Sequence, residues 1–188
     1  MKICVFGGTF DPLHIGHESL IKVLLKRFDK VIIMPAKQSP GKKTPIASEA
    51  DRLNMLSLSS VIDNPDLIID DYELKSNKEF SFTVDSIRYI RNKFKNDEIY
   101  LALGIDQFNI LYTWHNVEEL LSMVKIICFN RSGFINQNFQ IECEMIEEFN
   151  HDISSSQIKD LILKKSSKVK NMINTNIFEY IMKENLYK

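Results

Sequence analysis

Short runs of apolar residues recur along this chain, and longer segments of mixed polarity separate them. The runs rich in Val, Ile and Leu predict buried strands at 3–6, 30–35, 67–69, 99–103 and 125–129. The segments between the runs predict helices at 18–27, 47–60, 81–93 and 117–123. Strands that alternate with helices in this way predict an α/β fold, a doubly wound parallel sheet with right-handed crossovers.

The last third of the chain is less regular. The stretch 134–150 is acidic and has no clear period, and we assign no role to it. Residues 152–159, beginning with Asp152, predict a strand end that turns into a helix. A basic linker at 164–170 and a terminal helix at 174–187 complete the chain.

The size and charge of the chain exclude several classes of protein. Its 188 residues suffice for a single domain, 1–188, and we expect the helical part from about residue 154 onward to pack on it. A net charge of −1 gives no general attraction to nucleic acid or to a membrane surface. We expect no secretion signal, and no apolar run approaches the roughly 20 residues of a membrane span. Three scattered cysteines argue against a disulfide framework and fit a cytoplasmic protein.

The turn after the first strand carries the strongest chemical signal. Gly7 and Gly8 let the backbone approach a bulky anion without Cβ clashes. The next helix points its free N–H groups and its positive dipole end at the same place. His14 and His17 are three positions apart and so share one face of the helix start. A glycine pair is often only a turn, but with Thr9 and both histidines it predicts a site for nucleotide phosphates.

A metal site is the alternative interpretation of the two histidines. Zinc takes three or four ligands, and neither a cysteine nor a third histidine lies near His14 and His17 in the sequence. We therefore interpret the imidazoles as phosphate ligands rather than metal ligands, and Asp11 as a structural turn residue.

Further candidates follow the C-terminal ends of other strands, where ligands bind in open parallel sheets. The loop 36–46 carries lysines, among them Lys42, and no acid. It is either a solvated surface loop or a cationic lid over phosphates. Gly104 and Asp106 follow a central strand directly. An acid at that place is well positioned to accept hydrogen bonds from ribose hydroxyls.

Several polar and aromatic residues have a structural interpretation beside the functional one. Ser81 or Thr83 predicts an N-cap of its helix. Trp114 suits either the core or a stacking platform for a planar ligand. Arg52 is in a position to reach a ligand, but we predict for it an ion pair on a helix surface. The acids at 70–73 predict solvated charge.

Two motifs resemble the signatures of the nucleotidyltransferase superfamily. GGTFDPLHIGH at 7–17 resembles its T/S-F-D-x-x-H-x-G-H core, and ISSSQIK at 153–159 resembles its second signature, I-S-S-T/S-x-I-R/K. The resemblance implies a Rossmann-like fold and transfer of a nucleoside monophosphate with release of pyrophosphate. Taken alone, the three serines suit either an N-cap or an anion site. The resemblance places them and Lys159 beside the phosphates of ATP.

Within the superfamily, the chain is most similar to bacterial nicotinate-nucleotide adenylyltransferases. The similarity rests on the GGTFDP form of the first motif, the loop IMPAKQSPGKK, the segment SFT at 81–83, the segment LGID with the later Trp114, and the ending YIMKENLY. Gly41, Phe82, His115 and Lys159 depart from the family pattern, in which His, Tyr, Tyr and Arg are common. These departures concern affinity more than the class of reaction.

The resemblance implies transfer of AMP from ATP to nicotinate mononucleotide, which gives nicotinate adenine dinucleotide (deamido-NAD) and pyrophosphate. It implies His14 and His17 as catalytic residues and a Mg²⁺ ion that arrives with ATP. The implied ATP-binding residues are Gly7, Gly8, Thr9, Phe10, Gly16, Gly104, Asp106, Ser154, Ser155, Ser156 and Lys159. The implied acceptor-binding residues are Lys42, Ser81, Thr83, Trp114 and His115.

Two alternatives share the same fold. A pantetheine-phosphate adenylyltransferase has both signatures, but the segment around Trp114 and the ending at 180–187 argue against it. A non-catalytic nucleotide-binding protein would bind ATP and release no pyrophosphate. One carboxylate separates nicotinate from nicotinamide mononucleotide, so the choice between these acceptors stays open at this point, as does the oligomeric state.

Overall fold

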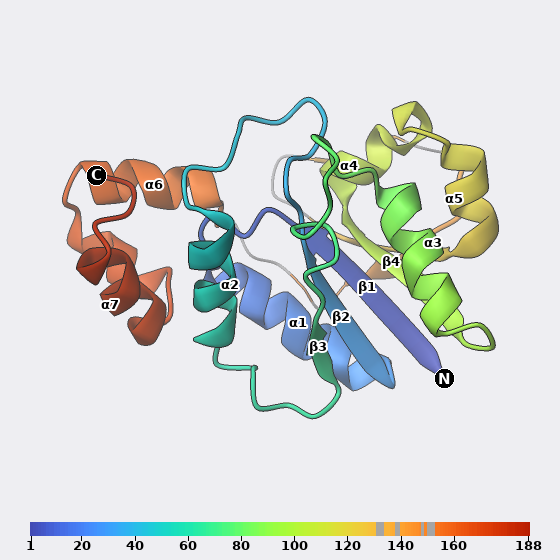
Figure 1. The fold of residues 1–188 in the computed structure, drawn as a ribbon, viewed down its shortest axis with the longest axis horizontal. Helices are drawn as coiled ribbons and strands as arrows, with labels where there is room; N and C mark the ends of the chain where they lie inside the picture. The colour runs from blue at the N-terminus through green and yellow to red at the C-terminus, as the bar shows by residue number, and fades with distance from the viewer. Residues whose placement is uncertain (131–133, 138–139, 148, 150–152) are drawn as a thin grey trace.

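The structure is a computed structural model that describes residues 1–130, 134–137, 140–147, 149 and 153–188. The strand end predicted at Asp152 lies outside the described residues. Six parallel strands form one sheet in the order β3-β2-β1-β4-β5-β6 (Figure 1). They are β1 (Lys2–Gly8), β2 (Lys30–Pro35), β3 (Leu67–Ile69), β4 (Glu98–Gly104), β5 (Lys125–Phe129) and β6 (Glu144–Ile146). This order confirms the predicted doubly wound, Rossmann-like sheet.

Alternate residues of the strands supply two cores, because successive side chains point to opposite faces of a sheet. Cys4 and Phe6 of β1 pack into the first core, and Ile3 and Val5 pack into the second. The helices of the first core are α1 (Ile15–Arg27), α2 (Glu49–Ser57), α6 (Ser155–Leu163) and α7 (Thr175–Lys183), with the 3₁₀ helix η2 (Ser167–Asn171). Those of the second core are α3 (Thr83–Lys93), α4 (Ile105–Asn109) and α5 (Val117–Met123), with the 3₁₀ helix η1 (Leu111–Thr113).

Some elements differ from their predicted bounds. Helix α1 begins at Ile15, earlier than predicted, because His14 caps it. Strand β6 lies in the stretch for which we predicted nothing. It has three residues, of which only Ile146 is buried, and so short a segment shows no period. Helix α4 has five residues, too few to show a helical pattern.

The strand order determines where a ligand can bind. The chain winds outward in both directions from β1 and β4, and such a reversal opens a crevice at the carboxyl ends of the two strands. Because Phe6 pairs with Ala102, Gly8 and Gly104 come two residues later at the same edge. The loop from β2 to α2 arches over this edge, and α6 and α7 lie beyond α2 (Figure 1). Among the described residues, no helix is long and apolar enough to cross a membrane.

Candidate active site

Close packing shapes the glycine turn at the end of β1. A Cβ on Gly8 would lie 3.0 Å from the Phe10 ring, so a side chain there would force the ring to shift. Phe10 is buried and has a φ of 50°, a left-handed conformation that costs a bulky residue about 1–3 kcal/mol. Gly7, in contrast, is exposed at the sheet edge, and a Cβ there would meet only the Met34 carbonyl oxygen, at 3.9 Å. The turn is therefore packed against the Phe10 ring at Gly8 and open to solvent at Gly7.

His14 and His17 form a stacked pair at the start of α1. Their ring centroids are 3.7 Å apart and their planes differ by 23°. His14 is the N-cap of the helix, and its Nδ1 accepts a hydrogen bond of 3.3 Å from the His17 backbone N–H. The Phe10 ring supports His17 edge-on, with 5.1 Å between centroids. Gly16, buried between the two histidines, completes this first turn, so both imidazoles lie at the positive end of α1.

Asp11 anchors the turn to the rest of the molecule. Its carboxylate is 2% exposed and accepts hydrogen bonds from the N–H groups of Ile46 and Ala47, both at 3.0 Å, from the Tyr187 hydroxyl at 2.7 Å and from Lys159 Nζ at 2.9 Å. Burial alone would raise the pKa of Asp11, but the hydrogen bonds from Ile46, Tyr187 and Lys159 hold that pKa below its ordinary value. These four donors give Asp11 the structural role that we predicted.

The second motif docks directly on the first. Ser154 caps α6, because its Oγ accepts a hydrogen bond of 3.2 Å from the Gln157 N–H. Ser155 Oγ donates to the Pro12 carbonyl oxygen at 3.0 Å, and Ser156 is exposed. With the Lys159 to Asp11 ion pair, these contacts join segments more than 140 residues apart. The start of α6 therefore lies beside the glycine turn.

Gly104 and Asp106 lie at the neighbouring strand end. A Cβ on Gly104 would be 2.5 Å from Asp106 Oδ1, so the carboxylate folds back over a position that only glycine leaves free. Gln107 Nε2 donates to Asp106 Oδ2 at 3.1 Å. The predicted ribose ligand is thus held at the carboxyl edge, beside the turn that contains Gly8.

The lysine-rich loop 36–46 is fixed at its base and open at its tip. Gln38 Nε2 donates to the Lys42 carbonyl oxygen at 2.8 Å. Gly41 has a φ of +70°, with nothing within 4 Å of a Cβ built there, and the Lys42 side chain is exposed. At the base, the Lys37 N–H donates to Ser81 Oγ at 3.1 Å, and the Ser81 N–H donates to the Gln38 carbonyl oxygen at 2.8 Å. The loop is therefore joined to the segment that leads into α3.

That segment brings together two of the departures from the family pattern. The ring of Phe82 packs against exposed His115, with 4.5 Å between centroids. Phe82 is the N-cap of α3 and makes no side-chain cap, so the prediction of an N-cap by Ser81 or Thr83 is wrong. Trp114 is half-buried and packs against the second core. The predicted acceptor residues Ser81, Thr83, Trp114 and His115 thus flank the start of α3.

Two further sequence predictions are wrong. Arg52 is 1% exposed instead of forming a surface ion pair, and its Nη1 donates to the carbonyl oxygens of Thr9 at 2.8 Å and Ala36 at 2.6 Å. Asp70 and Glu73 are buried rather than solvated. The spacing of Arg52 from buried Met55 and Leu56, three and four positions on, is the sequence signal that indicates its burial.

The described residues contain no group of three His, Cys, Asp or Glu side chains that could hold a metal ion. The four hydrogen bonds to Asp11 also leave its carboxylate little capacity for a cation. A divalent ion at this site would have to be held mainly by the phosphates of a nucleotide.

Comparisons with known proteins agree with this arrangement. Residues 5–161 match the model of the cytidylyltransferase-like family, and the chain belongs to that family. Over its full length it is 34% identical to the whole of the probable nicotinate-nucleotide adenylyltransferase of Caldicellulosiruptor saccharolyticus. It is 36% identical to the protein of the same name from a Hydrogenobaculum species, again over the whole chain and 98% of the relative.

Solved structures show the same fold. The nicotinic acid mononucleotide adenylyltransferase of Plasmodium falciparum, complexed with NaAD, matches with a TM-score of 0.82 at 24% identity. The match covers 99% of this chain and 97% of that one. At this identity the likeness establishes the fold, and the full-length relatives carry the argument on function.

Proposed function

We propose that this protein is a nicotinate-nucleotide adenylyltransferase, which transfers AMP from ATP to nicotinate mononucleotide in the cytoplasm. The observation that carries the proposal is the meeting of both nucleotidyltransferase motifs at one sheet edge, where Ser155 contacts Pro12 and Lys159 pairs with Asp11. Relatives that align over the full chain at 34% and 36% identity bear the name of this activity.

The reaction requires no protein base. A phosphate monoester is largely ionised at neutral pH, with a second pKa of about 6, so the oxygen of nicotinate mononucleotide attacks as it is. Its new bond to the α-phosphorus of ATP forms as the bond to the bridging oxygen breaks. The electron pair leaves with pyrophosphate. Catalysis then comes from alignment of the two phosphates and from stabilisation of the charge that develops on them.

The residues at the carboxyl edge divide this work. His14 and His17 contact the phosphates of ATP, at the end of α1 that favours negative charge. Backbone N–H groups of Thr9 and Phe10 lie at the junction of the two substrates. Lys42, on the exposed tip of its loop, supplies cationic charge to the phosphates. The phosphates of ATP would hold a Mg²⁺ ion, which would neutralise part of their charge.

The bases and sugars bind on either side of this junction. Asp106, held beside Gly104, accepts hydrogen bonds from the ribose of ATP, and Ser154, Ser155 and Ser156 bind its phosphates at the start of α6. On the other side, the segment 81–83, Trp114 and His115 receive the nicotinate mononucleotide. Backbone N–H groups at the start of α3 donate hydrogen bonds to the nicotinate carboxylate.

A panel of acceptors tests the proposal. Wild-type protein is given Mg²⁺ and ATP with nicotinate mononucleotide, nicotinamide mononucleotide or 4′-phosphopantetheine, and pyrophosphate and the mass of the product are measured. We expect deamido-NAD and pyrophosphate in equal amounts with nicotinate mononucleotide, and the highest kcat/KM for that acceptor. Pyrophosphate with 4′-phosphopantetheine alone, or ATP binding without turnover on any acceptor, would refute the assignment.

A further inference from the structure

Arg52 is the only buried arginine or lysine in the part of the chain that the structure describes. A single nitrogen, Nη1, donates to two carbonyl oxygens, that of Thr9 in the glycine turn and that of Ala36 at the start of the lysine-rich loop. The Ala36 N–H donates in turn to the Gly8 carbonyl oxygen at 2.8 Å. The guanidinium therefore fastens the turn beside the reacting phosphates to the loop over them.

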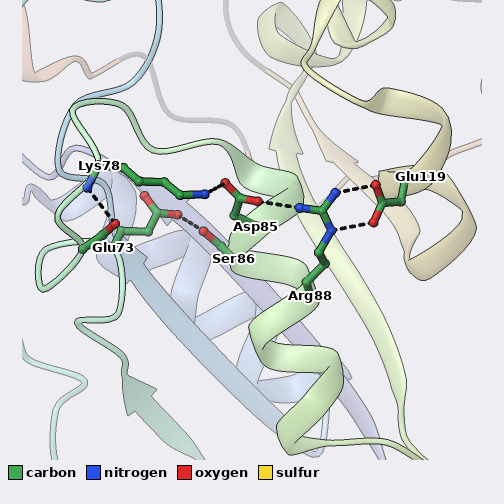
Figure 2. A network of polar contacts seen from close by, with 7 residues as sticks. Glu73, Lys78, Asp85, Ser86, Arg88 and Glu119 are labelled. Atoms are coloured by element: carbon green, nitrogen blue, oxygen red, sulfur yellow. Dashed lines mark hydrogen bonds and ion pairs between the residues drawn. The ribbon is translucent and has the colours of Figure 1, made fainter.

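The charges of two buried acids act on this guanidinium. Burial lowers the pKa of Arg52, while Asp11 and Glu73 are among the acids whose charge raises it. Asp11 forms an ion pair with Lys159 near the start of α6, on the side of the site proposed to bind ATP. Glu73 leads to the other side, because its carboxylate accepts a hydrogen bond from Ser86 in the first turns of α3 (Figure 2).

Glu73 contacts the start of α3, which lies in the region proposed to bind the acceptor. Ser81 holds the base of the lysine-rich loop through Lys37 and Gln38. Burial raises the pKa of Glu73, and the hydrogen bond from Ser86 opposes that rise. Figure 2 also shows a chain of surface ion pairs that joins Lys78, Asp85, Arg88 and Glu119. Asp85 and Arg88 belong to α3 and Glu119 belongs to α5, so these pairs connect the two helices. The start of α3 is therefore tied to Arg52 through Ala36 and the loop base that Ser81 holds.

The cost of this arrangement argues against a purely stabilising role. A buried guanidinium is expensive to desolvate, and a well-packed apolar side chain is often as stable or more so. The Nε of Arg52 is also buried and has no acceptor among the described residues, which adds a further penalty. Stability alone therefore does not account for a cation at this place.

We propose that Arg52 is a positioning residue that couples the two substrate sites. Through the carbonyl oxygens of Thr9 and Ala36 it fixes the phosphate turn and the lysine-rich loop together. Because Ser81 holds the base of that loop, Arg52 also links the phosphate turn to the start of α3. Binding of one nucleotide orders this unit and so strengthens binding of the other. The inference rests on the proposed adenylyl transfer for the identity of the two ligands.

Calorimetry on three variants tests the coupling. Affinity for nicotinate mononucleotide is measured with and without saturating α,β-methylene ATP, which cannot transfer AMP. We expect the analogue to raise that affinity at least about fivefold in the wild type and to have no effect in Arg52→Met, which keeps length without charge. Arg52→Lys, which keeps the cation, should recover most of the coupling. Ser57→Ala, an exposed change on α2, should match the wild type. Full coupling in folded Arg52→Met overturns the proposal.

Turnover gives a second reading of the same variants. We expect Arg52→Met to lower kcat about tenfold or more, because the two phosphates lose their alignment. The kcat of Arg52→Lys should lie between those of the wild type and Arg52→Met. Amide exchange of the wild type gives a reading that does not depend on how a variant folds. α,β-Methylene ATP alone should slow exchange at 36–38 and 81–83, and unchanged exchange at 81–83 also overturns the proposal. A wild type that forms no product on any acceptor instead refutes the proposed function.

Discussion

At the scale of single residues, Asp11 shows how one buried carboxylate organises the site. It receives N–H groups from the end of the lysine-rich loop, the ammonium of Lys159 in the second motif and the hydroxyl of Tyr187 near the C-terminus. The turn of the sequence motif was predicted from its own residues. Its partners were not, because they lie 35 to 176 positions away in the sequence.

Replacing Asp11 with Asn should therefore destabilise the fold in a way that depends on pH. At pH 7 we expect a loss of about 3–5 kcal/mol in the free energy of unfolding, since the change leaves Lys159 without its charge partner. The folded pKa of Asp11 lies below its unfolded value of about 3.9. Ionised Asp11 thus stabilises the fold above that pH, and the contribution disappears as the pH falls through the folded pKa.

Urea unfolding at pH 7 and near pH 3 measures this difference. The difference in the free energy of unfolding between wild type and Asp11→Asn should be smaller at the lower pH. Asp66→Asn, which alters an exposed and loosely paired acid, should stay within about 0.5 kcal/mol of the wild type at both. An equally wide gap for Asp11→Asn at both pH values would show that its charge has no part in stability.

At the scale of elements, the turn from β4 into α4 combines a predicted motif with an unpredicted helix. Gly104 and Asp106 were recognised from their place after a strand. Helix α4 escaped prediction because tertiary contacts rather than a periodic pattern hold its five residues, of which Ile105 and Phe108 are buried. The helix explains the spacing, since it folds the Asp106 carboxylate back over Gly104.

Gly104→Ala should disturb ATP binding through Asp106. The added Cβ would stand 2.5 Å from Oδ1 and force the carboxylate away from its present position. We expect the KM for ATP to rise about tenfold, as the loss of a charged hydrogen bond implies, while the KM for nicotinate mononucleotide changes less than about twofold. Asp106→Ala should give the same pattern in steady-state kinetics. An unchanged KM for ATP in either variant would show that Asp106 does not contact the ribose of ATP.

At the scale of the whole molecule, hydrophobic pattern alone predicted the doubly wound sheet. The bounds of β2, β3, β5 and α5 agree with the predicted ranges, because strong apolar runs or clear turns define them. Both signature motifs were found in the sequence, and the structure places them in contact.

The buried charges were harder to predict. Arg52 and Glu73 look like surface residues in the sequence, since charged side chains are rarely buried without partners. Their partners are the carbonyl oxygens of Thr9 and Ala36 for Arg52 and the hydroxyl of Ser86 for Glu73. Only the folded chain brings these groups together.

We propose that the turn from Gly7 to His17 carries out adenylyl transfer. Its most direct test is the rate at which His17→Ala forms deamido-NAD and pyrophosphate from ATP and nicotinate mononucleotide. Lys22→Ala, an exposed change on the same helix, is the matched control. We expect His17→Ala to lower kcat about a hundredfold or more, as loss of a transition-state donor does, with an unchanged circular dichroism spectrum. The control should keep the wild-type rate. Near-normal turnover by His17→Ala would show that this turn does not stabilise the transition state.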